Sequence, residues 1–582
     1  MNRIGPSKSE LFVANADGTK EHPLLAKSGF DYNASFSADG QWIVFTSERN
    51  GFGQADVYRV HPSGEGLERL TDSPSLDDQG ALSPDGTQLA FVSTRGTRKA
   101  NIWILNLKTR ELRNLTGTKE LQSAPEKPGG FFRPSWSPDG KWIAFSSDRG
   151  TEWKGHSNGA GWEHVQELSI YLIRPDGKDL RRMTQEGTCT GAPKWSADGK
   201  RIVFYEVPVE LTFFARIGLG PAVSSQIVSV DIATGKRTEH TTGPGLKVNP
   251  QFLPDSSIAY LVKAGPKPGL FYSGGMKEVE GKMRAPAWSS DGRQVVYEKV
   301  DFTSRPQNQQ LYSWDPNFEY RYTDVFPTFS RDGRLAVTDF LSTLGNPTAT
   351  ISTMDADGSN RRIVFDDKSG AAYSPTWSPD GQWLAFGFGG FFGTREKLPG
   401  KILMIKADGT GKQELTSGIP NGGFPSWSPD GKRIVFRVWT ENEKGLRLIN
   451  LEDKSVKVLT TEYDNVPFWS PLGDRILFTR KANGDFDIFT IRPDGTDLKQ
   501  LTTAPGNDAH ASWTDDGKHV MWSSGRYGFK DEAVLYDNNP QPYAALFIMN
   551  ADGSGQTQLT DSKWEDAMPK LIPKMRSLPK GI

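Results

Sequence analysis

The sequence predicts an all-β protein built of two tandem six-bladed β-propellers, each blade a four-stranded antiparallel sheet. Three observations predict this fold. A short phrase that centres on Ser-Pro-Asp-Gly or a close variant recurs eleven times between residues 33 and 517. A second kind of hairpin alternates with it and occurs twelve times. The 61 Gly, 38 Pro and 17 Trp residues indicate many turns and many large side chains to bury, which suits short strands better than helices.

The first kind of hairpin is the repeated phrase itself. Well-kept copies read RPSWSPDG (133–140), SPTWSPDG (374–381) and FPSWSPDG (424–431). Each is followed by an alternating apolar segment, such as WIAFSS (142–147). Alternation on both sides of an Asp-Gly pair is typical of two strands joined by a tight turn. Each copy therefore predicts the two inner strands of one sheet.

The second kind of hairpin supplies the two outer strands. Examples are IYLIRPDGKDLRRMT (170–184), IFTIRPDGTDLKQLT (488–502) and LFIMNADGSGQTQLT (546–560). Two hairpins in a unit of about 40 to 60 residues match the pattern of a four-stranded propeller blade. These blades resemble the TolB-type, WD40-like repeats known as PD40, and the resemblance covers nearly the whole chain. It implies a β-propeller, but it implies little about activity, because propellers host binding proteins, lyases, hydrolases and peptidase accessory domains.

The order of the hairpins divides the chain into two rings. The chain opens with a second-type hairpin (11–25) that has no phrase before it, so its inner strands must come from elsewhere. We expect residues 1–303 to form the first six-bladed propeller, closed by this N-terminal hairpin, and residues 304–582 to form the second, with 566–578 as a weak sixth phrase. A division into seven and five blades, a nested ring closed by the tail, and one wide twelve-bladed ring are the alternatives.

The first residues also bear on the compartment. Arg3 occupies the place that Arg49 and Arg149 hold after their second strands, so the sequence begins in the middle of a blade. A removed export leader explains this, and the TolB resemblance implies export; the protein is then periplasmic or secreted. An intact cytoplasmic chain is the alternative.

Composition excludes several classes of function. With 69 Lys and Arg against 70 Asp and Glu, the net charge is −1, so we expect no nucleic-acid partner. Cys189 is the only cysteine, which excludes an intramolecular disulfide or a thiolate metal cluster. The sequence has no stretch of 18 consecutive apolar residues, so we expect no insertion into a membrane. The letters GHSNG (155–159) fit GxSxG, but no α/β segment follows the repeats to form a nucleophile elbow, and the sequence has no Walker A loop or Rossmann fingerprint.

The insertions lie on one face of the rings. Turns within each hairpin are short, whereas the connections from strand two to three and from four to the next blade are longer, and alternating strand directions put those connections on the same face. Long loops in a compact repeat are usually functional. The connection richest in polar and aromatic residues is 146–171, which carries Arg149, Glu152, Trp153, His156, Trp162, Glu163 and His164.

Other connections contribute to the same mouth of the first ring. They carry Asp77, Asp78, Arg133, Tyr205, Glu206 and Arg216. In the second ring, His510 precedes an inner strand and is expected at the channel mouth. Acids, bases, cations and aromatic residues at one opening are typical of a pocket for a polar ligand.

Two function classes follow. The first is a non-catalytic protein that binds a saccharide-like or other polar small molecule, or a protein partner, through the decorated face; Arg133, Arg149, Trp153, Trp162, Asp77, Asp78, Glu206, Arg216 and His510 are the candidate contacts. The second is an enzyme at the first ring's mouth. As a lyase it uses His156 or His164 as base, Tyr205 as acid and Arg133 or Arg149 to neutralise a uronate. As a hydrolase it uses Glu152 and Glu163. No cofactor is certain; His156 and His164 with a carboxylate make a divalent metal possible, although their spacing matches no strong metal motif.

Overall fold

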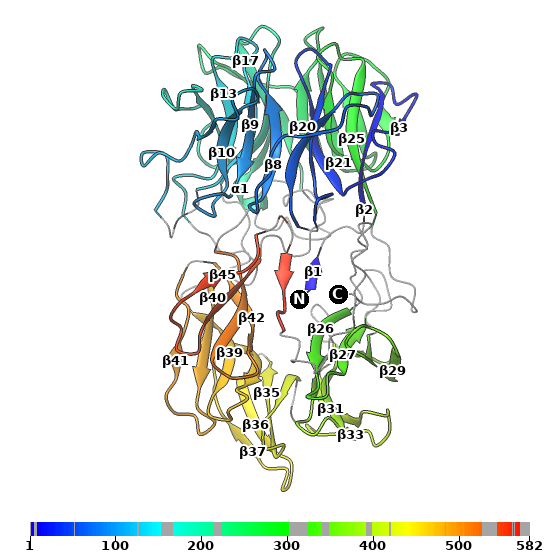
Figure 1. Cartoon of the computed structure of the whole chain (residues 1–582), viewed down its shortest axis with the longest axis vertical. Helices are drawn as coiled ribbons and strands as arrows, with labels where there is room; N and C mark the ends of the chain where they lie inside the picture. Colours follow the sequence, from blue (N-terminus) through cyan, green and yellow to red (C-terminus); the bar gives the residue numbers. More distant parts are fainter. Residues whose placement is uncertain are drawn as a thin grey trace.

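The structure is a computed structural model of the 582-residue chain. It describes residues 2–4, 8–51, 53–124, 127, 129–152, 167–212, 223–301, 324–339, 349–390, 399–417, 419, 421–440, 442–482, 485–504, 506–526, 544–561, 563 and 565–570. Two lobes of β-sheet stand one above the other (Figure 1). The all-β prediction is confirmed: the described residues form eleven four-stranded antiparallel sheets, a two-stranded sheet and one short helix, α1 (Val209–Thr212).

The first lobe holds six of the four-stranded sheets. From the inner to the outer strand they are β4 (Asp31–Phe36), β5 (Ile43–Ser47), β6 (Asp56–Val60), β7 (Glu68–Arg69); β8 (Asp77–Leu82), β9 (Gln88–Ser93), β10 (Asn101–Asn106), β11 (Leu112–Asn114); β12 (Phe131–Trp136), β13 (Ile143–Ser147), β14 (Ser169–Ile173), β15 (Arg181–Arg182); β16 (Thr188–Trp195), β17 (Arg201–Pro208), β18 (Gln226–Asp231), β19 (Arg237–Glu239); β20 (Leu246–Phe252), β21 (Ile258–Ala264), β22 (Gly269–Tyr272), β23 (Val279–Glu280); and β24 (Arg284–Trp288), β25 (Gln294–Asp301), β2 (Lys8–Asn15), β3 (His22–Pro23). Inner strands contact one another in the cyclic order β4, β8, β12, β16, β20, β24 and back to β4.

The second lobe holds the other five four-stranded sheets. They are β26 (Asp324–Phe329), β27 (Leu335–Asp339), β28 (Thr350–Met354), β29 (Arg362–Phe365); β30 (Ala371–Trp377), β31 (Trp383–Gly389), β32 (Lys401–Lys406), β33 (Gln413–Glu414); β34 (Gly422–Trp427), β35 (Arg433–Trp439), β36 (Lys444–Asn450), β37 (Val456–Val458); β38 (Asp464–Trp469), β39 (Ile476–Ala482), β40 (Asp485–Ile491), β41 (Lys499–Gln500); and β42 (Asp508–Trp513), β43 (His519–Ser524), β44 (Ala545–Asn550), β45 (Thr557–Gln558).

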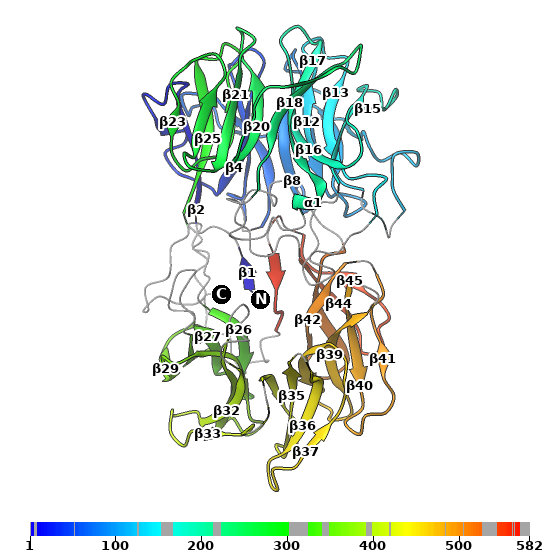
Figure 2. The same ribbon diagram turned by 180° about the vertical axis from the view of Figure 1, so that it is seen from behind.

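Both ends of the chain pair far from their sequence neighbours. Strand β2 runs antiparallel to β25 from Lys8 opposite Asp301 to Asn15 opposite Gln294, so the N-terminal hairpin completes the sheet that residues 284–301 begin. Strand β1 (Asn2–Ile4) instead pairs with β46 (Glu565–Ala567). This small sheet contacts β26 on one side and β43 and β44 on the other. Figures 1 and 2 both place it in the lower lobe, between β42 and β26.

The repeated Asp-Gly turns have a common set of hydrogen bonds. In the first, Ser37 Oγ donates to Asp39 Oδ1, and Asp39 Oδ1 also accepts from the Gln41 backbone N–H. Gly40 takes a φ of 70°, which costs glycine little. Ser137 and Asp139 repeat the arrangement in the third sheet. Because each turn is closed by its own side chains, the inner hairpins form with the register that the sequence predicts.

Apolar layers between neighbouring sheets form the cores of the lobes. Between the first two sheets, Val44, Val57, Leu89 and Phe91 are almost fully buried. Equivalent clusters lie between the following sheets in both lobes. Each alternating segment presents apolar residues on both faces because every sheet is covered by a neighbour on each side. Burial on this scale, at roughly 25 cal/mol per Å² of apolar surface, is the main force that holds the sheets together.

The faces that carry the connections are turned toward each other. Thr94, between β9 and β10, donates to Asp561, which follows β45. Arg98, in the same connection, donates to Gln558 at the end of β45. Helix α1, between β17 and β18, also lies on the side of the first lobe that faces the second (Figure 2). The decorated face of the first lobe is therefore the face next to the second lobe.

Candidate ligand-binding channel of the first lobe

A shared irregularity turns side chains of the six inner strands toward the lobe axis. Each inner strand has one residue in the left-handed region, with φ between 40° and 56°: Asn33, Gln79, Arg133, Ala192, Asn249 and Ala285. The register of each inner strand against its neighbour shifts at that residue. Such a bulge bends a strand and re-aims its side chains. All six bulges occur at the same level, so they meet around one axis.

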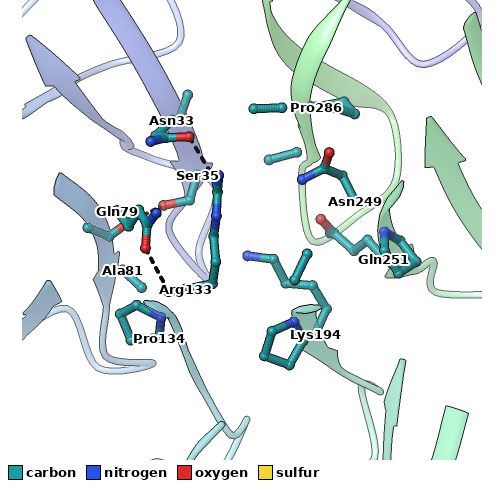
Figure 3. Close-up of a pocket in the computed structure, with 17 residues that line it drawn as sticks. Asn33, Ser35, Gln79, Ala81, Arg133, Pro134, Lys194, Asn249, Gln251 and Pro286 are labelled. Carbon is teal, nitrogen blue, oxygen red and sulfur yellow. Dashed lines mark hydrogen bonds between the residues drawn. The ribbon is translucent and has the colours of Figure 1, made fainter. Parts of the chain in front are cut away.

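The bulges enclose a cavity of about 60 Å³ at the centre of the first lobe. Its wall combines small residues, prolines and polar side chains from all six inner strands (Figure 3). A single water needs about 10–15 Å³ measured in this way, so the cavity has room for several waters or for one small polar group. Its polar members are Asn33, Ser35, Gln79, Arg133, Lys194, Asn249 and Gln251.

Two cationic side chains face this cavity. Lys194 extends from β16 toward Arg133 of β12, as Figure 3 shows. Burial disfavours the charged amine, and the nearby Arg133 charge adds repulsion, so the pKa of Lys194 falls to about 8. Within the described part of the chain, no hydrogen bond or ion pair reaches the Lys194 amine. Positive potential is thus concentrated at the axis.

Two amide side chains lie beside these cations. Gln79 Oε1 accepts from the Arg133 backbone N–H at 2.7 Å, whereas Gln79 Nε2 has no hydrogen-bond partner among the described residues, even though only 5% of the residue is exposed to solvent. Asn249 Oδ1 is likewise buried without a partner. Buried amide groups without partners cost about 1–3 kcal/mol each. The cavity therefore keeps hydrogen-bonding capacity that the protein itself does not use.

Arg133 connects the cavity to a buried carboxylate. Its Nη1 donates to Asn33 Oδ1 at 2.9 Å, and Asn33 Nδ2 donates to both oxygens of Asp78, also at 2.9 Å. Thr46 Oγ1 donates to Asp78 as well. From the other lobe, Lys563 reaches Asp78 Oδ2 at 3.4 Å. The cavity is therefore linked through Asn33 and Asp78 to the second lobe.

The structure places the predicted residues of the inner strands and of their ends in different roles. Arg133 lines the cavity, and Asp78 belongs to its supporting network. Asp77 instead forms an ion pair with Arg95, and burial, opposed by the Arg95 charge, raises the Asp77 pKa to about 6. Arg149 lies 5.7 Å over the Tyr171 ring and donates to backbone carbonyls of residues 120 and 121. Asp77 and Arg149 thus stabilise their blades and do not face the cavity.

The remaining described candidates do not converge with Arg133. Glu152 pairs with Lys127 at the surface, where both side chains are largely exposed. Tyr205 is buried within β17. Glu206 pairs with Arg237 at 2.6 Å. Six further candidates, Trp153, His156, Trp162, Glu163, His164 and Arg216, lie outside the described residues.

The channel of the second lobe differs in chemistry. It holds a cavity of about 30 Å³ with Phe326, Val466 and Phe468 in its wall. The sequence predicts His510 before an inner strand, at the channel mouth; it lies within β42 and lines this cavity, and burial lowers the His510 pKa to about 4. Lys570 also lines it, but its amine lies 3.8 Å from the centre of the Phe468 ring. Burial lowers the pKa of Lys570 to about 8, and the face of the Phe468 ring attracts its charged form.

Residues that the sequence reasoning missed are Lys194, Gln79 and Asn249. A signal for Lys194 existed. Ten of the eleven phrases place Ser, Thr, Ala, Gln or Phe two residues after the left-handed position, and only APKW (192–195) places a charge there. For Gln79 and Asn249 the sequence offers no comparable signal, because an amide in a strand is common.

Where the structure describes the chain, no three His, Cys, Asp or Glu side chains gather as metal ligands do. No described helix has the length and apolar character required to cross a membrane.

Comparison with known proteins adds the family context. Residues 3–132 and 391–531 match the TolB beta propeller domain family, PD40. A TolB homolog of Chlorobium luteolum is 32% identical over 158 residues, which cover 27% of this chain and 33% of that protein. The Tol-Pal system protein TolB of Francisella tularensis subsp. tularensis is 26% identical over 236 residues, covering 40% and 46%. The chain thus spans less than half the length of these curated relatives.

Among solved structures, TolB from Acinetobacter baumannii aligns with a TM-score of 0.34 at 18% identity, over 50% of this chain and 64% of that one. The family match and the curated relatives agree with the repeats that the sequence displays. The resemblance predicted from the Ser-Pro-Asp-Gly phrases is confirmed: the chain carries TolB-like β-propeller repeats of the PD40 type over residues 3–132 and 391–531.

Proposed function

We propose that this protein is a non-catalytic binding protein that takes a polar ligand into the channel of its first lobe, from the decorated face that lies next to the second lobe. One observation carries the proposal. The cavity at the axis is lined by polar side chains from six strands, and two of them, Gln79 and Lys194, have hydrogen-bonding groups that no described residue engages. Nearly all buried polar groups in proteins are paired, so groups left open at a cavity favour a ligand.

Binding is favoured over catalysis by the positions of the described acid and base candidates. A general acid or base must come within hydrogen-bond reach of the reacting group. Glu152 is engaged by Lys127 at the surface, and Tyr205 lies inside β17. Neither lines the cavity that holds Arg133.

The ligand's size class follows from the cavity. A space of about 60 Å³ admits one polar group of a ligand, whereas the rest of that ligand must extend along the channel. A saccharide and a protein side chain both meet this condition. The curated relatives include a protein named for the Tol-Pal system, so a peptide belongs among the ligands to test.

Two finer points of architecture belong to the same proposal. We take the second lobe as six-bladed, with the division near residue 303 and with β46 as the inner strand of its sixth blade. In support, Met568 has a φ of 52°, the left-handed value found in the inner strands of the other sheets, and the next residue is Pro569. Strand β1 is then the second strand of that blade. Export to the periplasm or the exterior stays a prediction, tied to a removed leader.

The experiment fills each of the two channels, in separate variants, with a larger side chain. Ala81 lines the first-lobe cavity and Thr376 lines that of the second, so Ala81→Met and Thr376→Met fill one channel each. Binding of glucose, glucuronate, glucose 6-phosphate and an acidic peptide is measured by calorimetry on each variant and on the unchanged protein. We expect Ala81→Met to abolish binding of whichever probe binds and Thr376→Met to preserve it. Binding that survives Ala81→Met, or no binding of any probe to the unchanged protein, overturns the proposal.

A further inference from the structure

We propose that the group held in the first-lobe channel is an oxyanion, the carboxylate or phosphate of the ligand, bound by the Lys194 amine together with the side-chain NH2 group of Gln79. This inference rests on the proposed function and narrows it to one chemical class.

The balance of charge around the cavity favours an anionic ligand. Two buried carboxylates accept hydrogen bonds from Asn33, Asp78 from its side chain and Glu298 from its backbone N–H. Each faces a cation already: Asp78 faces Lys563 at 3.4 Å, and Glu298 faces Arg284 at 3.9 Å. Lys194 receives no such carboxylate within the described chain. A buried cation is costly to the fold unless a counter-charge joins it. An entering anion supplies that counter-charge.

Two of the hydrogen-bonding groups that stay open at the cavity are donors. Gln79 Nε2 can only donate, and its own oxygen is already used by the Arg133 backbone N–H. The Lys194 amine likewise only donates. Donors that converge from different strands fit an acceptor with several oxygen atoms, as carboxylates and phosphates are.

Hydrogen bonds of the Arg133 side chain hold its charge near Lys194. Because Arg133 donates to Asn33, which in turn donates to Asp78, its guanidinium is held beside the cavity. Its charge lowers the affinity of the Lys194 amine for a proton and raises the affinity of the site for an anion. A neutral hydroxyl gains nothing from either charge, so we expect acidic ligands to be preferred over their neutral analogues.

The second lobe supplies a matched control within the same chain. Lys570 occupies the position two residues after the left-handed residue Met568, as Lys194 does after Ala192. Lys570 lies on the ring of Phe468, whereas no described aromatic ring lies against the Lys194 amine. Burial lowers the pKa of both amines to about 8, and the two lysines share this backbone position, so they differ in the aromatic ring beside Lys570 and in the open Gln79 donor that lines the cavity of Lys194.

The experiment compares Lys194→Met with Lys570→Met in the full chain. Calorimetry measures binding of glucuronate, glucose 6-phosphate and glucose, and circular dichroism checks the fold. We expect the unchanged protein to bind at least one of the two acidic probes at least about tenfold more tightly than glucose, and Lys194→Met to remove that preference, since a charge-assisted hydrogen bond is worth roughly 1.5–3 kcal/mol. Lys570→Met should keep it, and Lys194→Arg should restore part of it. Which acidic probe binds distinguishes a carboxylate from a phosphate ligand.

Outcomes that contradict the inference are separable from those that contradict the proposed function. Equal affinity for glucose and for both acidic probes, with loss of all three in Ala81→Met, overturns the oxyanion and keeps the channel as a binding site. An acidic preference that persists in Lys194→Met also overturns the inference. If Lys194→Met does not fold, Lys194→Gln replaces it with a side chain of similar length and no charge. No binding to any probe overturns both proposals.

Discussion

Lys563, which follows the last four-stranded sheet of the second lobe, reaches Asp78 of the first lobe, with 3.4 Å between Nζ and Oδ2. The same amine lies 4.3 Å from the centre of the Tyr32 ring. Asp78 is fully buried and Lys563 is 11% exposed, so this contact between the lobes is shielded from solvent. Because Asp78 also holds Asn33 in place, the contact between lobes and the wall of the ligand channel share one carboxylate.

Replacing Lys563 should therefore destabilise the protein. Lys563→Met leaves the Asp78 charge buried, although Asn33, Thr46 and the Gln79 backbone still donate to it. Loss of one partner of a buried ion pair costs about 3–5 kcal/mol, and the remaining donors should reduce this to roughly 1–3 kcal/mol. Urea unfolding measures the change.

The control for that variant is an ion pair of equal length at the surface. Lys141 and Asp139 are also 3.4 Å apart, but their side chains are 68% and 53% exposed. Lys141→Met should change the free energy of unfolding by less than about 0.5 kcal/mol. Equal effects of the two variants would show that the contact between lobes is not a buried pair.

Removing the cavity lysine should stabilise the protein when no ligand is present. Burial and Arg133 lower the Lys194 pKa from 10.5 to about 8. In the unfolded chain this amine binds a proton more tightly, so stability falls as the pH drops from about 10.5 to 8, and the whole cost is present at pH 7. Lys194→Met should then raise the free energy of unfolding at pH 7 by up to about 3 kcal/mol.

Urea unfolding of Lys194→Met at pH 7 and at pH 10 tests the sign of that effect. The gain should shrink at the higher pH, where the amine in the folded protein is already neutral. If Lys194→Met is less stable than the unchanged protein at pH 7, then Lys194 stabilises the fold, and ligand binding is not the reason for its presence.

The second lobe should lose stability in mild acid because of His510. Burial lowers the His510 pKa from 6.5 to about 4, so the unfolded chain takes up the proton first as the pH falls. The stability that this residue contributes is present above pH 6.5 and is lost between about 6.5 and 4, by at most about 3 kcal/mol. His510→Asn should flatten the pH dependence in that interval. Comparison with His519→Asn, at the start of β43, controls for the loss of an imidazole.

Two arginines that the sequence treats alike should differ in their effect on stability. Arg95 pairs with Asp77, whose side chain is fully buried, whereas Arg149 donates to two backbone carbonyls. Arg95→Ala leaves a buried carboxylate without its partner, at about 3–5 kcal/mol. Arg149→Ala should cost roughly 1 kcal/mol. Urea unfolding compares them. A loss of ligand binding in Arg149→Ala without loss of stability would restore its predicted contact with ligand.

Pairing of β1 with β46 should stabilise the second lobe and leave the stability of the first lobe unchanged. Deletion of residues 1–7 removes β1 and leaves β46 without the strand that pairs with it among the described residues. We expect faster hydrogen exchange at residues 565–567 and in β26, which β1 contacts, while the sheet of β24, β25, β2 and β3 keeps its protection. Faster exchange in that first-lobe sheet as well would mean that β1 supports both lobes.

The sequence by itself determined the sheets, because each phrase contains its own turn: Ser37, Asp39 and Gly40 close a hairpin through contacts a few residues apart. Arg3 lies in β1, which pairs with β46 at the other end of the chain; that this pair forms the inner strands of a sixth blade stays a proposal. Short-range hydrogen bonds and a period of two are local properties that repeat eleven times, so they can be read along the chain.

Only the tertiary structure decided which side chains meet. Gln79, Lys194 and Asn249 are far apart in the sequence and converge because equivalent bulges in separate strands stand at one level around the axis. The candidates taken from the connections were chosen for composition, and Asp77 and Arg149 proved to be engaged within their own blades. Where a side chain points, and whether a neighbour has already satisfied it, depends on contacts between blades and between lobes that no local pattern encodes.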